Sequence, residues 1–322
     1  MKNLSLKSLI ILIFFSVFLH AQTPPLIPEG WSDGYVYDNG IRVHYYHAIP
    51  APDKPVMIMV HGVTDNGLCW TTLTQELQKE YNVYMLDARG HGLSDPFTNT
   101  DDGETLVKDV VGFVEAMSIE DPILVGHSMG AATVMRIGAE YPDLTQSIIM
   151  LDPFLASLNP RPQNQKAKQP EQNNRKPETK ATKPQKRLSI NMFAPPETLV
   201  KQNNYSFDEL VEKGHNDFPK WNSVDIQCWA LSKKQYHGPY NDNAWKAMHG
   251  TMNIGDALSK ITVPALVLKA DTSPDSRKIN EEAVKGLKGI KLIHIDGAGH
   301  NLHHDELDRT VMEIQIFLQT IK

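Results

Sequence analysis

Cysteine is scarce in this sequence of 322 residues, where it occurs only twice. A disulfide-dense scaffold is therefore excluded. Positive charge is also limited, because 32 Lys and Arg residues are outnumbered by 38 Asp and Glu residues, giving a formal net charge of −6. Without a basic excess to attract phosphates, we expect no nucleic-acid partner. The mean hydropathy of −0.36 excludes a protein with many membrane spans.

One long apolar run remains, and it lies at the N-terminus. Lys2 and Lys7 precede an apolar stretch from Leu9 to Leu19, and Ala21 follows it. This pattern is typical of a secretory signal peptide over residues 1–21. An uncleaved anchor helix is the alternative, but a membrane span needs about 20 apolar residues. We therefore expect a secreted or periplasmic protein with no stable membrane span after cleavage.

Export permits a disulfide between the two cysteines, Cys69 and Cys228. Two positions do not determine a pairing. We expect two separate buried thiols and keep the disulfide as the alternative.

Short β-type runs alternate with helical patterns along most of the chain, which predicts an α/β fold with a largely parallel sheet and an antiparallel edge. The predicted strands are Ile41 to His47, Val56 to Val60, Val83 to Leu86, Ile123 to Val125, Ser147 to Leu151, Ala265 to Leu268 and Lys291 to Ile295. The predicted helices are Thr71 to Glu80, Glu104 to Met117, Gly130 to Glu140, Arg277 to Leu287 and Glu306 to Ile321.

The alternation is interrupted over residues 154–258, which carry short, aromatic-rich helical patterns. We interpret this range as a helical cap inserted into a core of residues 22–153 and 259–322. Residues 159–187 carry nine Lys or Arg and two Glu, with few apolar side chains. Such a composition predicts a flexible basic insertion.

The strongest chemical motif is Gly126-His127-Ser128-Met129-Gly130. It follows a predicted strand and opens a predicted helix, which is the context that a G-x-S-x-G nucleophile requires. The flanking glycines permit a sharp turn that exposes the Ser128 hydroxyl, so we expect Ser128 to be the nucleophile.

A serine hydroxyl needs a base to accept its proton and an acid to orient that base. His300 follows the last predicted strand, where an open α/β sheet places its site. Asp271 follows the strand before it, and the order Ser128, Asp271, His300 is the one expected after such a turn. Asp152, one strand earlier, is the rival acid.

Acyl transfer also requires donors for the developing oxyanion. The sequence predicts the backbone N–H groups of Val63, after His61-Gly62, and of Met129. His61 is then structural. We expect the substrate pocket to be lined by Trp70, His127 and Trp221.

A second histidine group follows the expected base. His303, His304 and Asp305 together with His300 suggest a metal site, but their position beside a complete set of catalytic residues argues against it. We expect no metal and no cofactor.

Together these motifs resemble the α/β-hydrolase fold family with a cap. In chain order they are His61-Gly62, Asp87 to Asp95, Gly126 to Gly130, Asp271 and Gly297 to His300. The resemblance covers the chain from about Tyr35 onward, except for the basic insertion. It implies a mostly parallel twisted sheet flanked by helices, with the helical cap between two strands.

Phe218 to Trp221 and His300 to Leu302 resemble a subgroup that includes N-formylmaleamate deformylase-like amide hydrolases and esterases. Two features of the sequence argue against particular activities of this family. Haloalkane dehalogenases and epoxide hydrolases of this fold carry an aspartate where this chain has Ser128, so neither activity is expected. The glycine run of some lipases is missing after Gly62, which argues against lipase activity on bulky esters.

The expected function is an exported serine hydrolase whose partner is a small-to-medium ester, lactone or thioester. Amide hydrolysis with the same residues is the nearest alternative. A catalytically silent domain that acts as a binding module is the alternative from another class.

Overall fold

The computed structural model describes residues 26–155, 195–238 and 240–321. The expected signal peptide and basic insertion lie outside these ranges. The strands are β1 (Ser32–Asp38), β2 (Ile41–His47), β3 (Val56–Val60), β4 (Asn82–Leu86), β5 (Ile123–His127), β6 (Ser147–Leu151), β7 (Ala265–Ala270) and β8 (Ile290–Ile295). The helices are α1 (Thr71–Leu77), α2 (Thr105–Ala116), α3 (Met129–Glu140), α4 (Pro196–Asn203), α5 (Phe207–Asp217), α6 (Ser223–Lys234), α7 (Asp242–His249), α8 (Ile254–Lys260), α9 (Pro274–Val284), α10 (Leu302–Asp305) and α11 (Leu307–Gln319). Two short 3₁₀ helices, η1 (Gly67–Trp70) and η2 (Pro142–Leu144), complete the described elements.

All eight described strands form one sheet in the order β1-β2-β4-β3-β5-β6-β7-β8. Strand β2 pairs antiparallel with both β1 and β4, and the remaining neighbours pair in parallel. The sheet is therefore mostly parallel with an antiparallel edge. The predicted fold class is confirmed.

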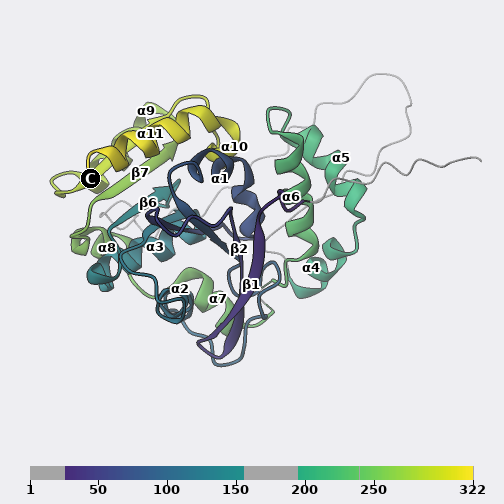
Figure 1. Cartoon of the computed structure of the whole chain (residues 1–322). Coiled ribbons are helices and arrows are strands. Elements are labelled where there is room, and N and C mark those ends of the chain that lie inside the picture. Colours follow the sequence, from purple (N-terminus) through teal and green to yellow (C-terminus); the bar gives the residue numbers. More distant parts are fainter. Residues whose placement is uncertain (1–25, 156–194, 239, 322) are drawn as a thin grey trace, which may run out of the picture.

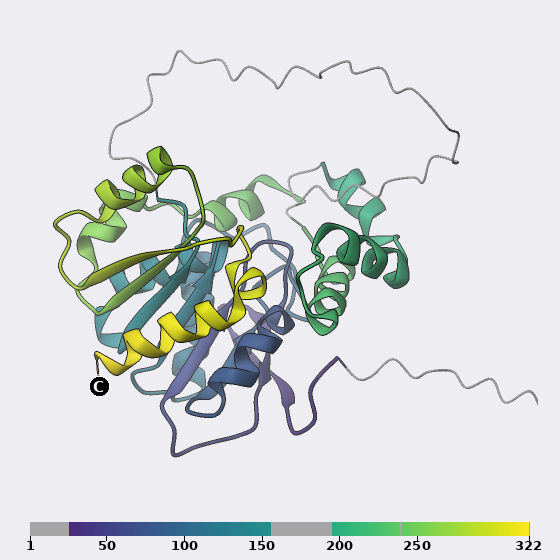
Figure 2. The same ribbon diagram turned by 90° about the horizontal axis from the view of Figure 1, so that it is seen from above.

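Two apolar layers sandwich the sheet because successive strand residues point to opposite faces. In β3, Met57 and Met59 pack with residues of α1 and α11, whereas Ile58 and Val60 pack with residues of α2 and α3. Figure 2 shows the helices on both sides of the sheet.

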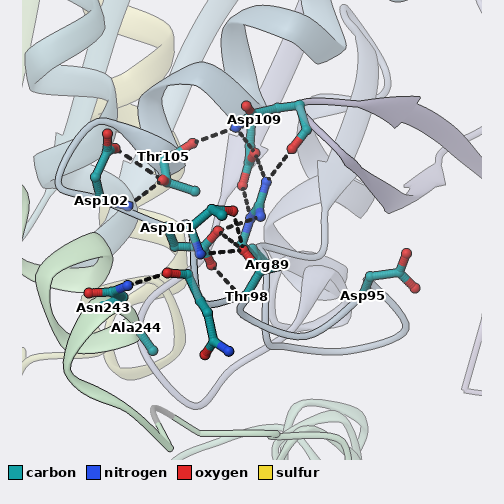
Figure 3. A network of polar contacts seen from close by, with 12 residues as sticks. Arg89, Asp95, Thr98, Asp101, Asp102, Thr105, Asp109, Asn243 and Ala244 are labelled. Atoms are coloured by element: carbon teal, nitrogen blue, oxygen red, sulfur yellow. Dashed lines mark hydrogen bonds and ion pairs between the residues drawn. The ribbon is translucent and has the colours of Figure 1, made fainter.

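The loop after β4 is fixed by buried charges. Arg89 is 2% exposed and donates to both carboxylate oxygens of Asp109, at 2.7 and 2.9 Å, and to Asp101 at 2.8 Å (Figure 3). Asp87, also buried, accepts from the backbone N–H groups of Gly67 and Leu93. The motif from Asp87 to Asp95 thus holds the loops and helices around the sheet together.

Helices α4, α5 and α6 form a lobe beside the sheet (Figure 1). Its small core contains Leu210, Trp221, Ile226 and Trp229. Helix α8 packs against α3 and contributes Ala257 and Leu258 to the main core, although its first five residues fall within the range 154–258 predicted for the cap. Below, "cap lobe" means α4 to α6.

Candidate active site

Ser128 stands on a strained turn between β5 and α3. Its φ of 51° lies in the left-handed region that non-glycine residues rarely adopt. A Cβ at Gly126 would lie 2.2 Å from the Gly130 carbonyl oxygen, and one at Gly130 would lie 2.0 Å from that of Val60. Only glycine therefore fits at these two positions, and the sharp turn inferred from the sequence is present.

A cavity of about 450 Å³ lies between this turn and the cap lobe. Residues of the core line one side of the cavity. Residues of α5 and α6, together with Phe218 after α5, line the other side. The lining residues are Gly62, Val63, Thr64, Asp65, His127, Ser128, Lys213, Asp217, Phe218, Trp229, Lys233, His300 and Asn301. The structure thus brings Ser128 and His300, 172 positions apart, to one cavity.

The carboxylate beside His300 belongs to Asp152. His300 Nδ1 lies 2.6 Å from Asp152 Oδ2. Because a carboxylate oxygen accepts, Nδ1 carries the proton, which leaves Nε2 as the ring nitrogen available to Ser128. The expectation that Asp271 orients His300 is therefore wrong in this structure, and the rival Asp152 takes that place.

Asp152 is held in its ionised form. Burial opposes its charge, but the hydrogen bond from His300 and the Lys269 ammonium, 2.5 Å from Oδ1, outweigh that cost and lower the pKa of Asp152 to about 2. The backbone N–H of Ala270 also donates to Oδ1 at 3.2 Å. Lys269 is a residue that the sequence interpretation missed.

Asp271 lies on the surface and serves the neighbouring loop. Its side chain is 42% exposed, and it accepts from the Gly297 N–H at 3.0 Å and from Arg277 at 2.6 Å. The Gly297 hydrogen bond, followed by Arg277, lowers the pKa of Asp271. Asp271 thus fixes the loop that carries His300 without reaching its ring.

His127 connects the nucleophile turn to the same loop. Its Nε2–H donates to the backbone carbonyl of His300 at 2.9 Å. Burial, with a further contribution from His300, lowers the pKa of His127 to about 4, so the ring is neutral at pH 7. His127 lines the cavity, in agreement with its expected place in the pocket.

The side chain of His61 connects the loop after β3 to the loop after β4. Its Nε2 accepts from the Ala88 N–H at 3.0 Å, so the neutral ring carries its proton on Nδ1, which donates to the Gly62 carbonyl at 2.7 Å. Burial lowers the pKa of His61, which favours this neutral form. His61 has a structural role, as the sequence indicated, and Val63 lies on the cavity wall. Met129 opens α3, and the first N–H groups of a helix lack partners within it.

The expected pocket residues Trp70 and Trp221 do not belong to the cavity wall. Trp70 is fully buried in the main core, with its ring centroid 4.8 Å from that of His303. Trp221 stacks on Phe218 and donates to Asp305 at 2.7 Å, which joins the cap lobe to α10. The aromatic residues on the wall are Phe218 and Trp229.

His303 and His304 are buried beside the site. Their ring centroids lie 4.1 Å apart, and His304 Nδ1 lies 3.3 Å from Asp225. Within the described ranges, no group of three or more His, Cys, Asp or Glu side chains is arranged to hold a metal ion. Cys69 and Cys228 are buried free thiols.

Two further charged residues on the wall, Asp65 and Lys233, were not singled out from the sequence. Asp65 comes two positions after Val63, and that proximity to the expected oxyanion donor is a usable signal. Lys233 lies 168 positions from Asp65, and no sequence pattern connects the two.

The comparisons with known proteins identify the family of the fold. Residues 55–307 match the family model described as alpha/beta hydrolase fold. The chain belongs to this family. The predicted resemblance is confirmed.

Individual relatives are more distant. A 2-(acetamidomethylene)succinate hydrolase of Mesorhizobium japonicum is 34% identical over 98 residues, which span 30% of this chain and about a third (35%) of that relative. Epoxide hydrolase 1 of Caenorhabditis elegans is 24% identical over 316 residues, covering 91% of this chain and 72% of the relative. The solved N-formylmaleamic acid deformylase of Pseudomonas putida S16 is 21% identical with a TM-score of 0.64, covering 88% of this chain and 100% of that one. The last likeness shows the fold alone.

Proposed function

We propose that this protein is a serine hydrolase in which Ser128, His300 and Asp152 form the catalytic triad. The observation that carries the proposal is the 2.6 Å contact between His300 Nδ1 and Asp152 Oδ2, on a cavity that also exposes Ser128. The substrate class is a small-to-medium carboxylic ester, lactone or thioester.

In the proposed reaction, Ser128 Oγ attacks the substrate carbonyl while His300 Nε2 accepts the hydroxyl proton. His300 then returns the proton to the leaving oxygen or sulfur, and an acyl-enzyme remains. Water attacks that acyl group by the same route and regenerates Ser128. Asp152 keeps the proton of His300 on Nδ1 and stabilises the imidazolium that forms.

The N–H groups of Val63 and Met129 are the proposed donors to the oxyanion. Met129 N–H belongs to a helix N-terminus, whose dipole favours negative charge. Gly62 permits the close approach of the two loops, because a Cβ there would lie 3.3 Å from Ser128 Cβ and 2.8 Å from His127 Nδ1.

The cavity volume supports the proposed substrate size. Sites for small molecules usually measure about 300–1,000 Å³, and this one measures about 450 Å³. Phe218 and Trp229 line it with rigid aromatic surface, which discriminates by shape.

Amide hydrolysis is the second candidate, favoured by the resemblance of Phe218 to Trp221 and of His300 to Leu302 to deformylase-like amide hydrolases. We place esters first because an oxygen or sulfur leaving group depends less on protonation than an amine does. Epoxide hydrolysis is disfavoured, because the family resemblance implies an aspartate in epoxide hydrolases of this fold at the position where this chain has Ser128.

A fluorophosphonate probe tests the proposal, because it labels only an activated serine. Mass spectrometry should locate the adduct on Ser128 in the wild type, and Ser128→Ala should give no adduct. The absence of labelling would identify a catalytically silent domain, and labelling of another serine would remove Ser128 as the nucleophile. Paired ester and amide substrates with one acyl group then distinguish the two hydrolase candidates.

Export is a separate part of the proposal. It rests on the pattern of residues 1–21, which lie outside the described ranges, and N-terminal sequencing of the protein recovered from cells tests it. Within the described ranges, no helix is long and apolar enough to cross a membrane.

A further inference from the structure

Lys233, in the last turn of α6, is a buried cation without a role in the steps above. Its side chain is 6% exposed. Its ammonium donates to Thr64 O at 2.9 Å, to Thr64 Oγ1 at 2.8 Å and to Asp65 Oδ1 at 2.9 Å. An ammonium has three N–H donors, so all three are used on two consecutive residues of the loop after β3.

The backbone at Thr64 needs such support. Its φ of 69° lies in the left-handed region, which is strained for a β-branched residue and persists only where its surroundings hold it. Thr64 is 4% exposed and directly follows Val63, the proposed oxyanion donor. Because φ of Thr64 sets the orientation of the Val63–Thr64 peptide, a relaxation of Thr64 would turn that peptide and shift Val63, together with its N–H.

Helix α6, which carries Lys233, is held in place by hydrogen bonds and an ion pair to residues of the core. Asp225, 1% exposed, accepts from Thr72 Oγ1 at 3.0 Å and lies 3.3 Å from His304 Nδ1. Gln235, just after α6, accepts from Asn66 Nδ2 at 2.8 Å. Lys233 therefore acts from an anchored helix.

We propose that Lys233 is a positioning residue that holds Thr64 in its strained conformation and thereby sets the direction of the Val63 N–H toward the oxyanion. This inference rests on the proposed function. It assigns α6 of the cap lobe a part in transition-state stabilisation in addition to enclosing the substrate.

The test compares Lys233→Met with Lys234→Met. Lys234 is the matched control because its ammonium donates to the carbonyls of Asn203 and Tyr205 inside the cap lobe rather than to the loop after β3. Lys233→Met should lower kcat by about 10- to 100-fold, as expected when an oxyanion donor is misdirected, with KM changed by less than about threefold. Its affinity for a boronic acid that mimics the tetrahedral intermediate should fall by the same factor as kcat/KM. Lys234→Met should retain wild-type kcat.

A second variant separates positioning from charge. Glycine adopts a positive φ without strain, so Lys233→Met/Thr64→Gly should recover part of the lost kcat. No recovery in this double variant would overturn the positioning role. If Lys233→Met does not fold because Asp65 is left unpaired, Lys233→Met/Asp65→Asn removes that charge and carries the same expectation of lowered kcat.

The outcomes also separate this inference from the proposed function. If the fluorophosphonate does not label wild-type Ser128, the proposed function fails and the inference fails with it. If wild-type Ser128 is labelled and Lys233→Met is labelled at the same rate, the inference alone is wrong.

Discussion

Strands β6 and β7 are neighbours in the sheet, and each is followed by an aspartate, yet the two carboxylates have different surroundings. Asp152 directly follows β6 and is 12% exposed, with its oxygens bound to His300 and Lys269. Asp271 directly follows β7 and is 42% exposed, with its oxygens bound to Gly297 and Arg277. Both positions lie at the carboxyl edge, where such sheets carry their sites.

The difference lies in the local backbone and in burial. Asp152 has a φ of 43°, and its N–H donates to the Leu268 carbonyl at 2.7 Å, so the chain turns sharply where β6 ends. Asp271 donates its N–H to the Ala298 carbonyl at 2.8 Å and stays with the loop of β8. An aspartate at the end of a strand is therefore a candidate acid, and the backbone turn at that aspartate determines whether its carboxylate reaches His300.

The largest effect should come from Asp152→Asn. The amide leaves the ring of His300 without a carboxylate to fix its tautomer, and the comparable loss in serine hydrolases is about 10⁴-fold in kcat. Steady-state kinetics on a soluble activated ester measures this loss. A variant that keeps more than about a tenth of wild-type kcat would remove Asp152 from the triad.

The acid sensitivity of folding should also depend on Asp152. Its pKa is lowered from 3.8 to about 2, so the folded protein favours the ionised form. The stability from this preference is present above pH 3.8 and is lost as the pH falls toward 2. The full shift corresponds to about 2 kcal/mol.

Urea unfolding of wild type and Asp152→Asn at about pH 5 and about pH 2.5 measures that contribution. The difference in unfolding free energy between the two proteins should shrink at the lower pH. An unchanged difference would contradict the ionised state assigned to Asp152.

Lys269→Met should have a smaller effect, about tenfold in kcat. The substitution removes the cation from Asp152 Oδ1 while the hydrogen bond from His300 to Oδ2 stays. The pKa of Asp152 should rise, so in urea unfolding at a series of acidic pH values the variant should begin to lose stability at a higher pH than the wild type. Loss of stability at the wild-type pH would show that Lys269 does not support the pair.

Asp271→Asn should be the mildest change, within about threefold of wild-type kcat, because the carboxylate touches the loop of His300 only at Gly297. Since the side chain is on the surface, the melting temperature should change little. A loss comparable to that of Asp152→Asn would reverse the comparison.

Most of the fold could be predicted from the sequence because hydrophobic periodicity reports burial directly. The seven predicted strands and five predicted helices all correspond to observed elements, with ends shifted by a few residues. Helix α8 could not be assigned to the main core in the same way, because a helix of seven residues carries too little periodicity to show which surface it covers.

In the candidate site too, the residues with a local sequence signature were predictable and those set by tertiary contacts were not. Ser128 and Gly62 were predictable because a glycine-rich turn has a local signature. Asp152 was only a rival because the choice between two strand ends depends on a dihedral angle and on Lys269, which no local pattern displays. Trp70 was assigned to the pocket from its position in the chain, and its burial in the main core depends on contacts with distant helices.

The rate at which a fluorophosphonate labels Ser128 tests the central claim most directly, because it requires no knowledge of the natural substrate. Wild type, Asp152→Asn and Asp271→Asn are compared side by side under identical conditions. The structure predicts that Asp271→Asn is labelled at nearly the wild-type rate and that Asp152→Asn is slower by about 10⁴-fold. The opposite ranking, with Asp271→Asn the slower of the two, would contradict the triad of Ser128, His300 and Asp152.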